Sequence, residues 1–534
     1  SQNAYLHLGF CYVKLNQKNN ARMAYASAAD MDFDEKVKEE AAYNYTLSTL
    51  ETTTPFGESI TAFENFITKY PTSVYKNQIY ENLVTAYLSS KNYVAASISL
   101  SKLSNLSPEM RNVKAYILFQ LGTEQFVKGN FDEAVNIFTN ALSESSPSFK
   151  SAQVYYWRAE SYFRLEKYNE ARKDYTEFLN KKGAAEMPEY NLANYAIAYT
   201  FFKQKNYSEA RSMFNKYIKN EKNTLSANYA DGLDRLADCY FIARDFSNAE
   251  KYYAQSIEKG GKNGDYASFQ KAFVQGLQKN YRGKILGLQK LITDYPQSDY
   301  QDDAFYEMGR SFVLLDQQKN AIDAYQILIA KYPQAPLARK AAFEIGMLYY
   351  NQNQNEQAIE AFKKVINDYP NSEETRTALE TLESIYVEQN RVDEFFAYTK
   401  TLGAGIVVAN PSKEDSLTYL AAEKMYMKNN FAGATGSFER YLQNFCDNGR
   451  FCTSARFYLA DCYYSTDRID EAYNQYKTLS TMLGNPFMET VLVRLSEIAY
   501  DKKEFETALA SFKQLQIIAE DPENIKASKI GVLR

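Results

Sequence analysis

Histidine and tryptophan are nearly missing from this sequence, which contains one of each, His7 and Trp157. A histidine-based catalytic triad or a histidine-rich metal site would have to use His7, and no Cys or Asp motif stands near it. We therefore interpret His7 as a surface or packing residue. The sequence also lacks a nucleophile elbow, a glycine-rich dinucleotide turn and a cluster of His and Cys. These absences predict a chain that is not an enzyme, has no catalytic residue and binds neither a metal nor a cofactor.

Long apolar runs and an excess of one charge are also lacking. No stretch approaches the roughly 18 uninterrupted apolar residues of a membrane-spanning helix, so we expect no direct membrane span. Lys and Arg number 61 against 66 Asp and Glu, without a long basic run. Because a phosphate backbone selects a clustered basic face, no nucleic acid partner is expected.

No signal peptide is visible, but Ser1 is not a natural start, and a helical pattern runs up to Arg534. We interpret the chain as a piece of a longer protein.

Tyrosine and phenylalanine, in contrast, are abundant, with 46 and 33 residues, and they recur in a repeated helical phrase. Residues 305–312 and 342–349 carry the phrase, in which a glycine stands between large side chains. An alanine follows nine residues after each phrase, and an aromatic residue stands four residues beyond the alanine. The phrase then closes on a Tyr-Pro pair. Such pairs occur at Tyr70-Pro71, Tyr295-Pro296, Tyr332-Pro333 and Tyr369-Pro370.

This order of residues resembles the tetratricopeptide repeat (TPR), a hairpin of two helices. The resemblance covers nearly the whole chain, with a period of ~37 residues against the usual 34. It implies an all-α fold, an α-α superhelix that forms a TPR-like solenoid of about fourteen helix-turn-helix repeats. The small position of the second helix, or its equivalent, falls at Ala21, Ser59, Ala96, Ala134, Ala171, Ala210, Ala249, Lys284, Ala321, Ala358, Phe395, Ala434, Ala472 and Ala508.

Small residues at fixed positions allow the two helices of a hairpin to approach closely. On the first helix we expect glycines in this role, and on the second helix the alanines. The aromatic residues then fill the remaining gap, and the proline after the second helix ends it. The glycines are Gly9, Gly122, Gly309 and Gly346, and the second-helix aromatics are Phe63, Phe138, Phe214, Phe362, Phe438 and Phe512.

Helix starts can also be predicted at three inter-repeat junctions. Ser298 followed by Gln301 indicates a capping box. Ser372 precedes two glutamates, which suit a helix N-terminus. Pro336 is compatible with a first helical turn.

Two repeats depart from the pattern, because Lys284 and Phe395 replace the small residue and should loosen hairpin packing. Unusual segments adjoin both. Glycine-rich residues 260–264 precede Lys284, and Gly-Ala-Gly at 403–405 and Asn-Pro-Ser at 410–412 follow Phe395. We hypothesise hinges or irregular turns there, with degenerate but rigid repeats as the alternative. The hinges would divide the chain into an N-terminal TPR arm at 1–259, a middle arm at 265–402 and a C-terminal arm at 412–534.

Five cysteines are too few for a disulfide scaffold. Cys11, Cys239 and Cys462 each precede the aromatic residue of a first helix, so we expect them to be small core residues. Cys446 and Cys452 bracket an inter-repeat loop. In an oxidising compartment they could form a disulfide, and otherwise they are two unpaired thiols.

The TPR resemblance implies a concave groove lined by first helices, in which a protein or peptide partner binds. Aromatic side chains and carboxylates line the predicted groove, which would favour partners with basic or tyrosine-compatible extended segments. The Lys and Asn clamp that some TPR domains use for a C-terminal carboxylate is not evident. The groove positions are Tyr156, Glu160, Phe163, Tyr195, Tyr199, Phe202, Asp234, Asp238, Phe241, Tyr306, Arg310, Phe343, Tyr350, Tyr419, Glu423, Tyr426, Phe457, Asp461 and Tyr464.

The resulting functional prediction is a non-catalytic scaffold or adaptor that binds proteins or extended peptides. The alternative is the repeat region of a larger regulator or enzyme whose active domain lies outside this chain. The Tyr-Pro-x-Ser junction resembles bacterial cell-envelope TPR proteins, which implies a role in envelope assembly and a periplasmic location, with the cytoplasm as alternative. Neither the identity of the partner nor self-association follows from the sequence.

Overall fold

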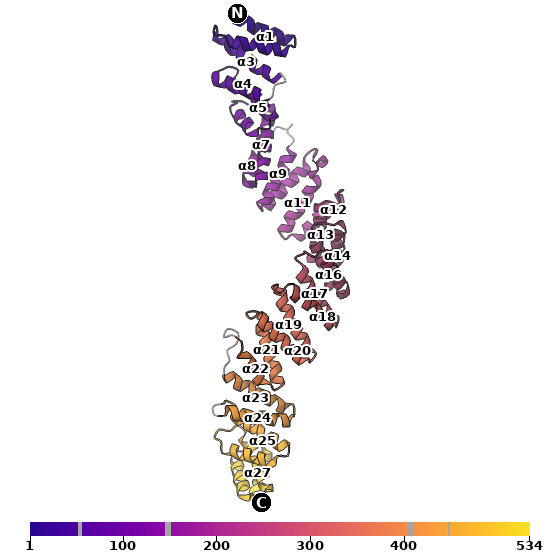
Figure 1. Cartoon of the computed structure of the whole chain (residues 1–534), viewed down its shortest axis with the longest axis vertical. Helices are drawn as coiled ribbons and strands as arrows, with labels where there is room; N and C mark the ends of the chain where they lie inside the picture. The colour runs from indigo at the N-terminus through magenta and orange to yellow at the C-terminus, as the bar shows by residue number, and fades with distance from the viewer. Residues whose placement is uncertain (52–55, 145–150, 403–410, 447–448) are drawn as a thin grey trace. The chain divides into compact units, whose positions relative to one another are not determined.

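The computed structural model describes residues 1–51, 56–144, 151–402, 411–446 and 449–534, and these residues are mainly helical (Figure 1). No strand occurs in these ranges. The all-α fold class predicted from the sequence is therefore confirmed. The chain divides into two compact units, Ser1–Lys279 and Asn280–Arg534, here called unit 1 and unit 2.

Unit 1 contains α1 (Gln2–Lys14), α2 (Lys18–Ala29), α3 (Glu35–Glu51), α4 (Phe56–Lys69), α5 (Lys76–Ser89), α6 (Tyr93–Ser101), α7 (Pro108–Lys128), α8 (Phe131–Glu144), α9 (Ala152–Arg164), α10 (Tyr168–Asn180), a short 3-10 helix η1 (Ala184–Glu186), α11 (Glu189–Lys203), α12 (Tyr207–Asn220), α13 (Ala227–Ile242), α14 (Phe246–Lys259) and α15 (Gly264–Leu277). Consecutive α-helices pack as hairpins, and first helices such as α9 and α11 also contact each other. This is the arrangement of an α-solenoid.

Unit 2 repeats the same architecture. It contains α16 (Tyr281–Asp294), α17 (Gln301–Leu314), α18 (Gln318–Lys331), α19 (Pro336–Asn351), α20 (Asn355–Asp368), α21 (Glu373–Glu388), α22 (Val392–Thr399), α23 (Pro411–Met427), α24 (Phe431–Phe445), α25 (Cys452–Ser465), α26 (Ile469–Ser480), α27 (Met488–Asp501), α28 (Phe505–Ile518) and α29 (Pro522–Leu533). Helices α17–α28 pair as hairpins in order, and α29 packs on α28.

One residue in each described hairpin turn adopts a left-handed backbone conformation. In the α7–α8 turn this residue is Gly129, with φ +83°, which glycine adopts without a steric penalty. Elsewhere the position holds side chains that adopt positive φ less readily. These residues are Asn16, Lys91, Glu166, Lys205, Arg244, Lys279, Asp316, Asn353, Asn390, Asn429, Asp467 and Lys503. Their recurrence, at 279, 316, 353 and 390 for example, marks the repeat independently of its core residues.

The predicted small positions lie in the interior in every repeat, from Ala21 to Ala508. Even the two exceptions are buried, with Lys284 7% and Phe395 4% exposed. The ammonium of Lys284 forms an ion pair with Glu307 on α17. Phe395 packs against the ring of Tyr386, with ring centroids 6.0 Å apart, and its helix α22 has only eight residues.

Aromatic rings lie directly over the first-helix glycines. A Cβ atom added at Gly9 would lie 2.2 Å from the ring of Tyr25, and one at Gly309 would lie 2.3 Å from Tyr325. The same contact occurs between Gly346 and Phe362, at 2.5 Å. These distances are far below van der Waals contact, so the glycines are required for the close helix approach that the sequence predicted.

Two of the three predicted helix starts are confirmed. Ser372 caps α21 by accepting a hydrogen bond from the Thr375 amide at 3.1 Å, and Pro336 occupies the first turn of α19. The capping box at Ser298 is wrong, because α17 begins at Gln301. The Gln301 side chain instead donates to the carbonyls of Ile292 and Tyr295 at 3.2 and 2.8 Å. It thereby satisfies the end of α16, where helical carbonyls lack internal partners.

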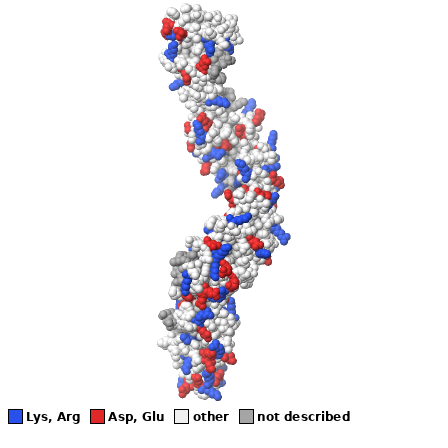
Figure 2. Space-filling model, viewed as in Figure 1, with Lys and Arg blue, Asp and Glu red and all other residues white. Residues whose placement is uncertain are grey.

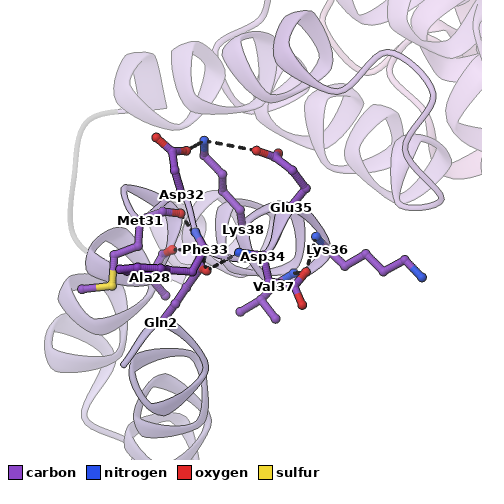
Figure 3. Close-up of polar contacts among 10 residues, drawn as sticks. All are labelled: Gln2, Ala28, Met31, Asp32, Phe33, Asp34, Glu35, Lys36, Val37 and Lys38. Carbon is purple, nitrogen blue, oxygen red and sulfur yellow. Dashed lines mark hydrogen bonds and ion pairs between the residues drawn. The ribbon is translucent and has the colours of Figure 1, made fainter.

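Gln2 ties the start of α1 to the end of α2 in a similar way (Figure 3). Its amide donates to the carbonyls of Ala28 and Met31 at 3.1 and 2.6 Å. Its side-chain oxygen accepts from the amides of Phe33 and Asp34 at 3.2 and 2.8 Å. All polar groups of this buried amide are thus used, as burial requires.

The glycine-rich segment at 260–264 forms a turn in unit 1. Gly260 has φ +66°, and a Cβ on Gly261 would lie 2.5 Å from that of Ala230 on α13. Residues 403–405 and 410 lie outside the described residues. The hinges and the three arms remain predictions.

Candidate protein-binding surface

Most of the groove positions predicted on α9 and α11 line one pocket of about 380 Å³ in unit 1. The first helices α9 and α11 and the start of the first helix α13 form it, together with Tyr175 of the second helix α10. Five of the predicted residues meet there, whereas Phe202, Asp234, Asp238 and Phe241 do not line it. The lining residues are Tyr156, Glu160, Phe163, Arg164, Tyr175, Leu192, Tyr195, Ala196, Tyr199, Lys203 and Asn228. We call this the α9–α13 pocket.

The tyrosines of the pocket also belong to the hydrophobic core. Tyr156 is 9% exposed and packs edge-on against Phe178, with ring centroids 5.3 Å apart. Tyr195 and Tyr199 both pack edge-on against the buried ring of Phe214, at 6.0 and 5.5 Å. Only part of each ring can therefore meet a ligand.

The carboxylates near the pocket are occupied by tyrosine hydroxyls. Tyr175 donates to Glu160 at 2.6 Å, and burial raises the pKa of Glu160. Tyr195 donates to Asp231 on α13 at 2.7 Å, and Tyr199 donates to the same oxygen. Asp231 was not among the predicted groove residues. Its position four residues before Arg235, one helical turn, was the available signal.

Asp234 and Asp238 on α13 are interior side chains rather than groove-surface ones. Asp238 is 7% exposed and accepts hydrogen bonds from Tyr253 and Tyr266 at 2.6 and 2.7 Å, and Arg235 pairs with it. Burial raises its pKa. Asp234 is 1% exposed, and burial raises its pKa to about 7. Its Oδ1 accepts no hydrogen bond from any described residue.

In unit 2 the predicted residues of α17 and α19 pack mainly against their own hairpins. Tyr306 and Phe343 contact Tyr325 and Phe362, with ring centroids 5.7 and 5.6 Å apart. Arg310 is exposed and pairs with Glu307 at 3.0 Å, and Tyr350 is half-buried. A pocket of about 860 Å³ opens elsewhere, between α18, α19 and α20, and contains none of the predicted residues. Its lining includes Ile329, Tyr349, Lys363 and Asp368.

The predicted residues of α23 and α25 form tyrosine–carboxylate pairs. Tyr419 donates to Glu423 at 2.8 Å, and Tyr426 donates across to Asp461 at 2.6 Å. Tyr419 is itself 7% exposed. Beside them, Phe457 stacks on Phe487 with ring centroids 4.2 Å apart, and Arg494 lies over the Tyr464 ring at 4.5 Å.

Cys446 and Cys452 are disulfide-bonded in the structure, with Cα atoms 5.5 Å apart. The chain next to the bond is tied to α23. Asp415 accepts from the amide of Arg450 at 3.0 Å and from the hydroxyl of Tyr441. Phe451 stacks on Tyr419 with ring centroids 4.5 Å apart. The sequence did not indicate these contacts.

The other cysteines show one error of the sequence analysis. Cys239 and Cys462 are buried, as predicted, but Cys11 is exposed. Cys239 packs against Ala198, Ala210 and Phe214 of the preceding repeat.

His7 is exposed, and its ring lies 6.1 Å from that of Phe10. Within the described ranges, no three His, Cys, Asp or Glu side chains gather as metal ligands.

None of the helices in those ranges has the length and apolar character needed to cross a bilayer. Figure 2 shows basic and acidic side chains interspersed over the visible face.

Family models of the tetratricopeptide repeat match this sequence in three regions. The matches cover residues 2–35, the overlapping spans 119–185 and 156–224, and the consecutive spans 303–335 and 340–372. No curated protein matches the sequence.

Among solved structures, the chain is similar to the C-terminal part of a TPR protein from Cytophaga hutchinsonii. Identity is 18%, 49% of this chain and 98% of that chain are covered, and the TM-score is 0.41. YrrB, described as a TPR protein with an unusual peptide-binding site, is 20% identical over 38% of this chain and 96% of its own, with a TM-score of 0.31. PilF of Pseudomonas aeruginosa is 16% identical over 43% and 97%, with a TM-score of 0.32. The matches to family models, and not these structures, show that the chain contains tetratricopeptide repeats.

Proposed function

Since this chain is a tetratricopeptide-repeat protein, we propose that it is a non-catalytic scaffold that binds other proteins through extended segments laid across its first helices. The α9–α13 pocket carries the proposal. Residues of three consecutive first helices, together with Tyr175 of α10, surround this cavity, so a segment seated there touches several repeats at once. Its partly exposed tyrosine rings offer apolar contact area of the kind that dominates protein interfaces.

Filling the pocket tests this proposal. Alanine substitution of Tyr195 and Tyr199 is unsuitable, because both rings support Phe214 in the core. Ala196→Trp instead introduces a large side chain at a partly exposed position of the pocket wall. We expect the variant to fold and to lose partners that the parent chain retains from source-cell lysate, by about tenfold or more in recovered amount.

The matched control is Ser212→Trp, at an exposed position of the second helix α12. It adds the same surface tryptophan outside the pocket and should retain the partners. If both variants retain the same partners as the parent chain, the α9–α13 pocket is not the binding surface and the proposal fails.

We also propose an oxidising location, such as the bacterial periplasm, for the folded chain. The Cys446–Cys452 disulfide supports this, because disulfides persist in oxidising compartments and are rare in the cytosol. Protein alkylated inside intact source cells with a mass-tagged maleimide should react at the exposed Cys11 only. Tagging of Cys446 and Cys452 without prior reduction would contradict the proposal.

A further inference from the structure

The charge of the α9–α13 pocket differs from what its sequence indicates. Two acidic groups at the pocket, Glu160 in the wall and Asp231 behind it, accept hydrogen bonds from Tyr175, Tyr195 and Tyr199. Asp231 also faces the guanidinium of Arg235, with Nε and Oδ1 3.5 Å apart. A carboxylate held in this way by internal donors offers less to a ligand, because part of its acceptor capacity is already used.

The basic groups of the pocket, unlike its carboxylates, are not held by direct ion pairs. Arg164 and Lys203 are the last residues of α9 and α11, and both are exposed. They occupy equivalent repeat positions, each two residues before the left-handed turn residue, Glu166 or Lys205. Neither forms an ion pair with any residue in the described ranges. Arg164 lies near enough to Glu160 to oppose the rise in pKa that burial causes in that carboxyl group, but no direct ion pair within the described residues holds either cation, and both line the pocket beside its tyrosine rings.

We infer that the α9–α13 pocket takes an extended protein segment in which a large apolar side chain stands next to side-chain carboxylates. The apolar side chain lies between Tyr156, Tyr195 and Tyr199, and the carboxylates meet Arg164 and Lys203. This inference rests on the proposed function and reverses the charge preference that the sequence suggested. Charge complementarity at a rim acts mainly on specificity and association rate, whereas the apolar contact supplies most of the affinity.

Three fluorescein-labelled nonapeptides test the inference by fluorescence anisotropy with the whole chain. The first carries a central phenylalanine between two aspartates, the second replaces the aspartates with lysines, and the third replaces the phenylalanine with alanine. We expect the first peptide to bind about tenfold more tightly than either of the others at low salt. Its advantage over the lysine peptide should shrink at high salt, because exposed charges are screened.

Charge reversal at the rim is the decisive comparison. Arg164→Glu with Lys203→Glu should invert the preference, so that the lysine peptide binds more tightly than the aspartate peptide. The control Lys216→Glu with Lys219→Glu makes the same change in net charge on exposed positions of α12, and it should leave the preference unchanged. Arg164→Gln with Lys203→Gln should abolish the preference. This milder variant keeps the test valid if the charge-reversed variant does not fold.

Three results would overturn the inference: a lysine peptide that binds as tightly as the aspartate peptide, a preference that survives charge reversal, or no binding of any peptide at about 1 mM. The proposed function can stand even then. If Ala196→Trp loses partners while the aspartate peptide shows no advantage, the pocket binds proteins but not by this chemistry. If Ala196→Trp loses nothing, the proposed function itself has failed.

Discussion

Phe362→Ala is expected to lower the free energy of unfolding around α19 and α20 by about 3–5 kcal/mol. Phe362 is fully buried on α20, and its ring lies over Gly346 on α19. Because glycine has no side chain to move into the space, the cavity left by the ring cannot collapse from that side. Neighbouring repeats contact each other only locally, so the loss should be largest near these helices.

Hydrogen exchange of the folded chain measures this effect, because it resolves stability helix by helix. Leu286→Ala is the control. Leu286 is 67% exposed on α16, also in unit 2, and its replacement should change stability by no more than about 0.5 kcal/mol. Equal exchange rates in α19 and α20 for the Phe362 variant and this control would show that the packing of Phe362 is not important.

Gly346→Ala is a second variant that tests the same packing contact. The new Cβ would lie 2.5 Å from the Phe362 ring, and overpacking of this kind costs about 1–3 kcal/mol. In the presence of Phe362→Ala the methyl group enters the vacated space. The double variant should therefore be less destabilised than the sum of the single variants, a coupling that independent sites do not show.

Asp234→Asn is expected to stabilise unit 1 at pH 8 by about 2–4 kcal/mol, with little change near pH 4. Burial raises the pKa of Asp234 from 3.8 to about 7, against the lowering influence of Ser256 and Arg235 and with a raising contribution from Asp231 and Asp238. Between pH 3.8 and about pH 7, Asp234 of the folded chain holds a proton that the same group has lost in the unfolded chain. The stabilising contribution of the protonated group is therefore complete below about pH 4 and is lost as the pH rises through about 7. Asparagine carries no charge at any of these values and removes the dependence.

Denaturant unfolding of the parent chain and the variant between pH 4 and pH 8 checks this prediction, with hydrogen exchange of α13 as the local measure. Asp231→Asn on the same helix is the matched control. Asp231 accepts from Tyr195 and faces Arg235, so its loss should lower stability at pH 8. A variant at Asp234 that follows the parent chain at every pH would show that this carboxyl group is not protonated in the fold.

The groove shows where prediction from the sequence reached its limit. The repeat register identified the first-helix positions, and on α9 and α11 these do converge on one pocket. The register could not separate residues facing the groove from those facing inward. Asp234 and Asp238 are two buried examples. A carboxylate on a helix face is solvated by default, but Asp238 is buried with hydrogen bonds from Tyr253 and Tyr266, whereas burial of Asp234 raises its pKa instead.

Residue spacing was sufficient to predict the local structure of each repeat: two helices of repeat length, a proline after α4, α16, α18 and α20, and small residues where the helices approach each other. These follow from constraints within one hairpin, so a period of ~37 residues is sufficient to reveal them. Only the tertiary structure decided which charges remain available. Glu160 accepts a hydrogen bond from Tyr175 of its own hairpin and Asp231 accepts one from Tyr195 of the preceding repeat, while Arg164 and Lys203 form no ion pair within the described residues. Hydrogen bonds between repeats depend on the directions of side chains across a helix interface, and residue spacing alone does not contain that information.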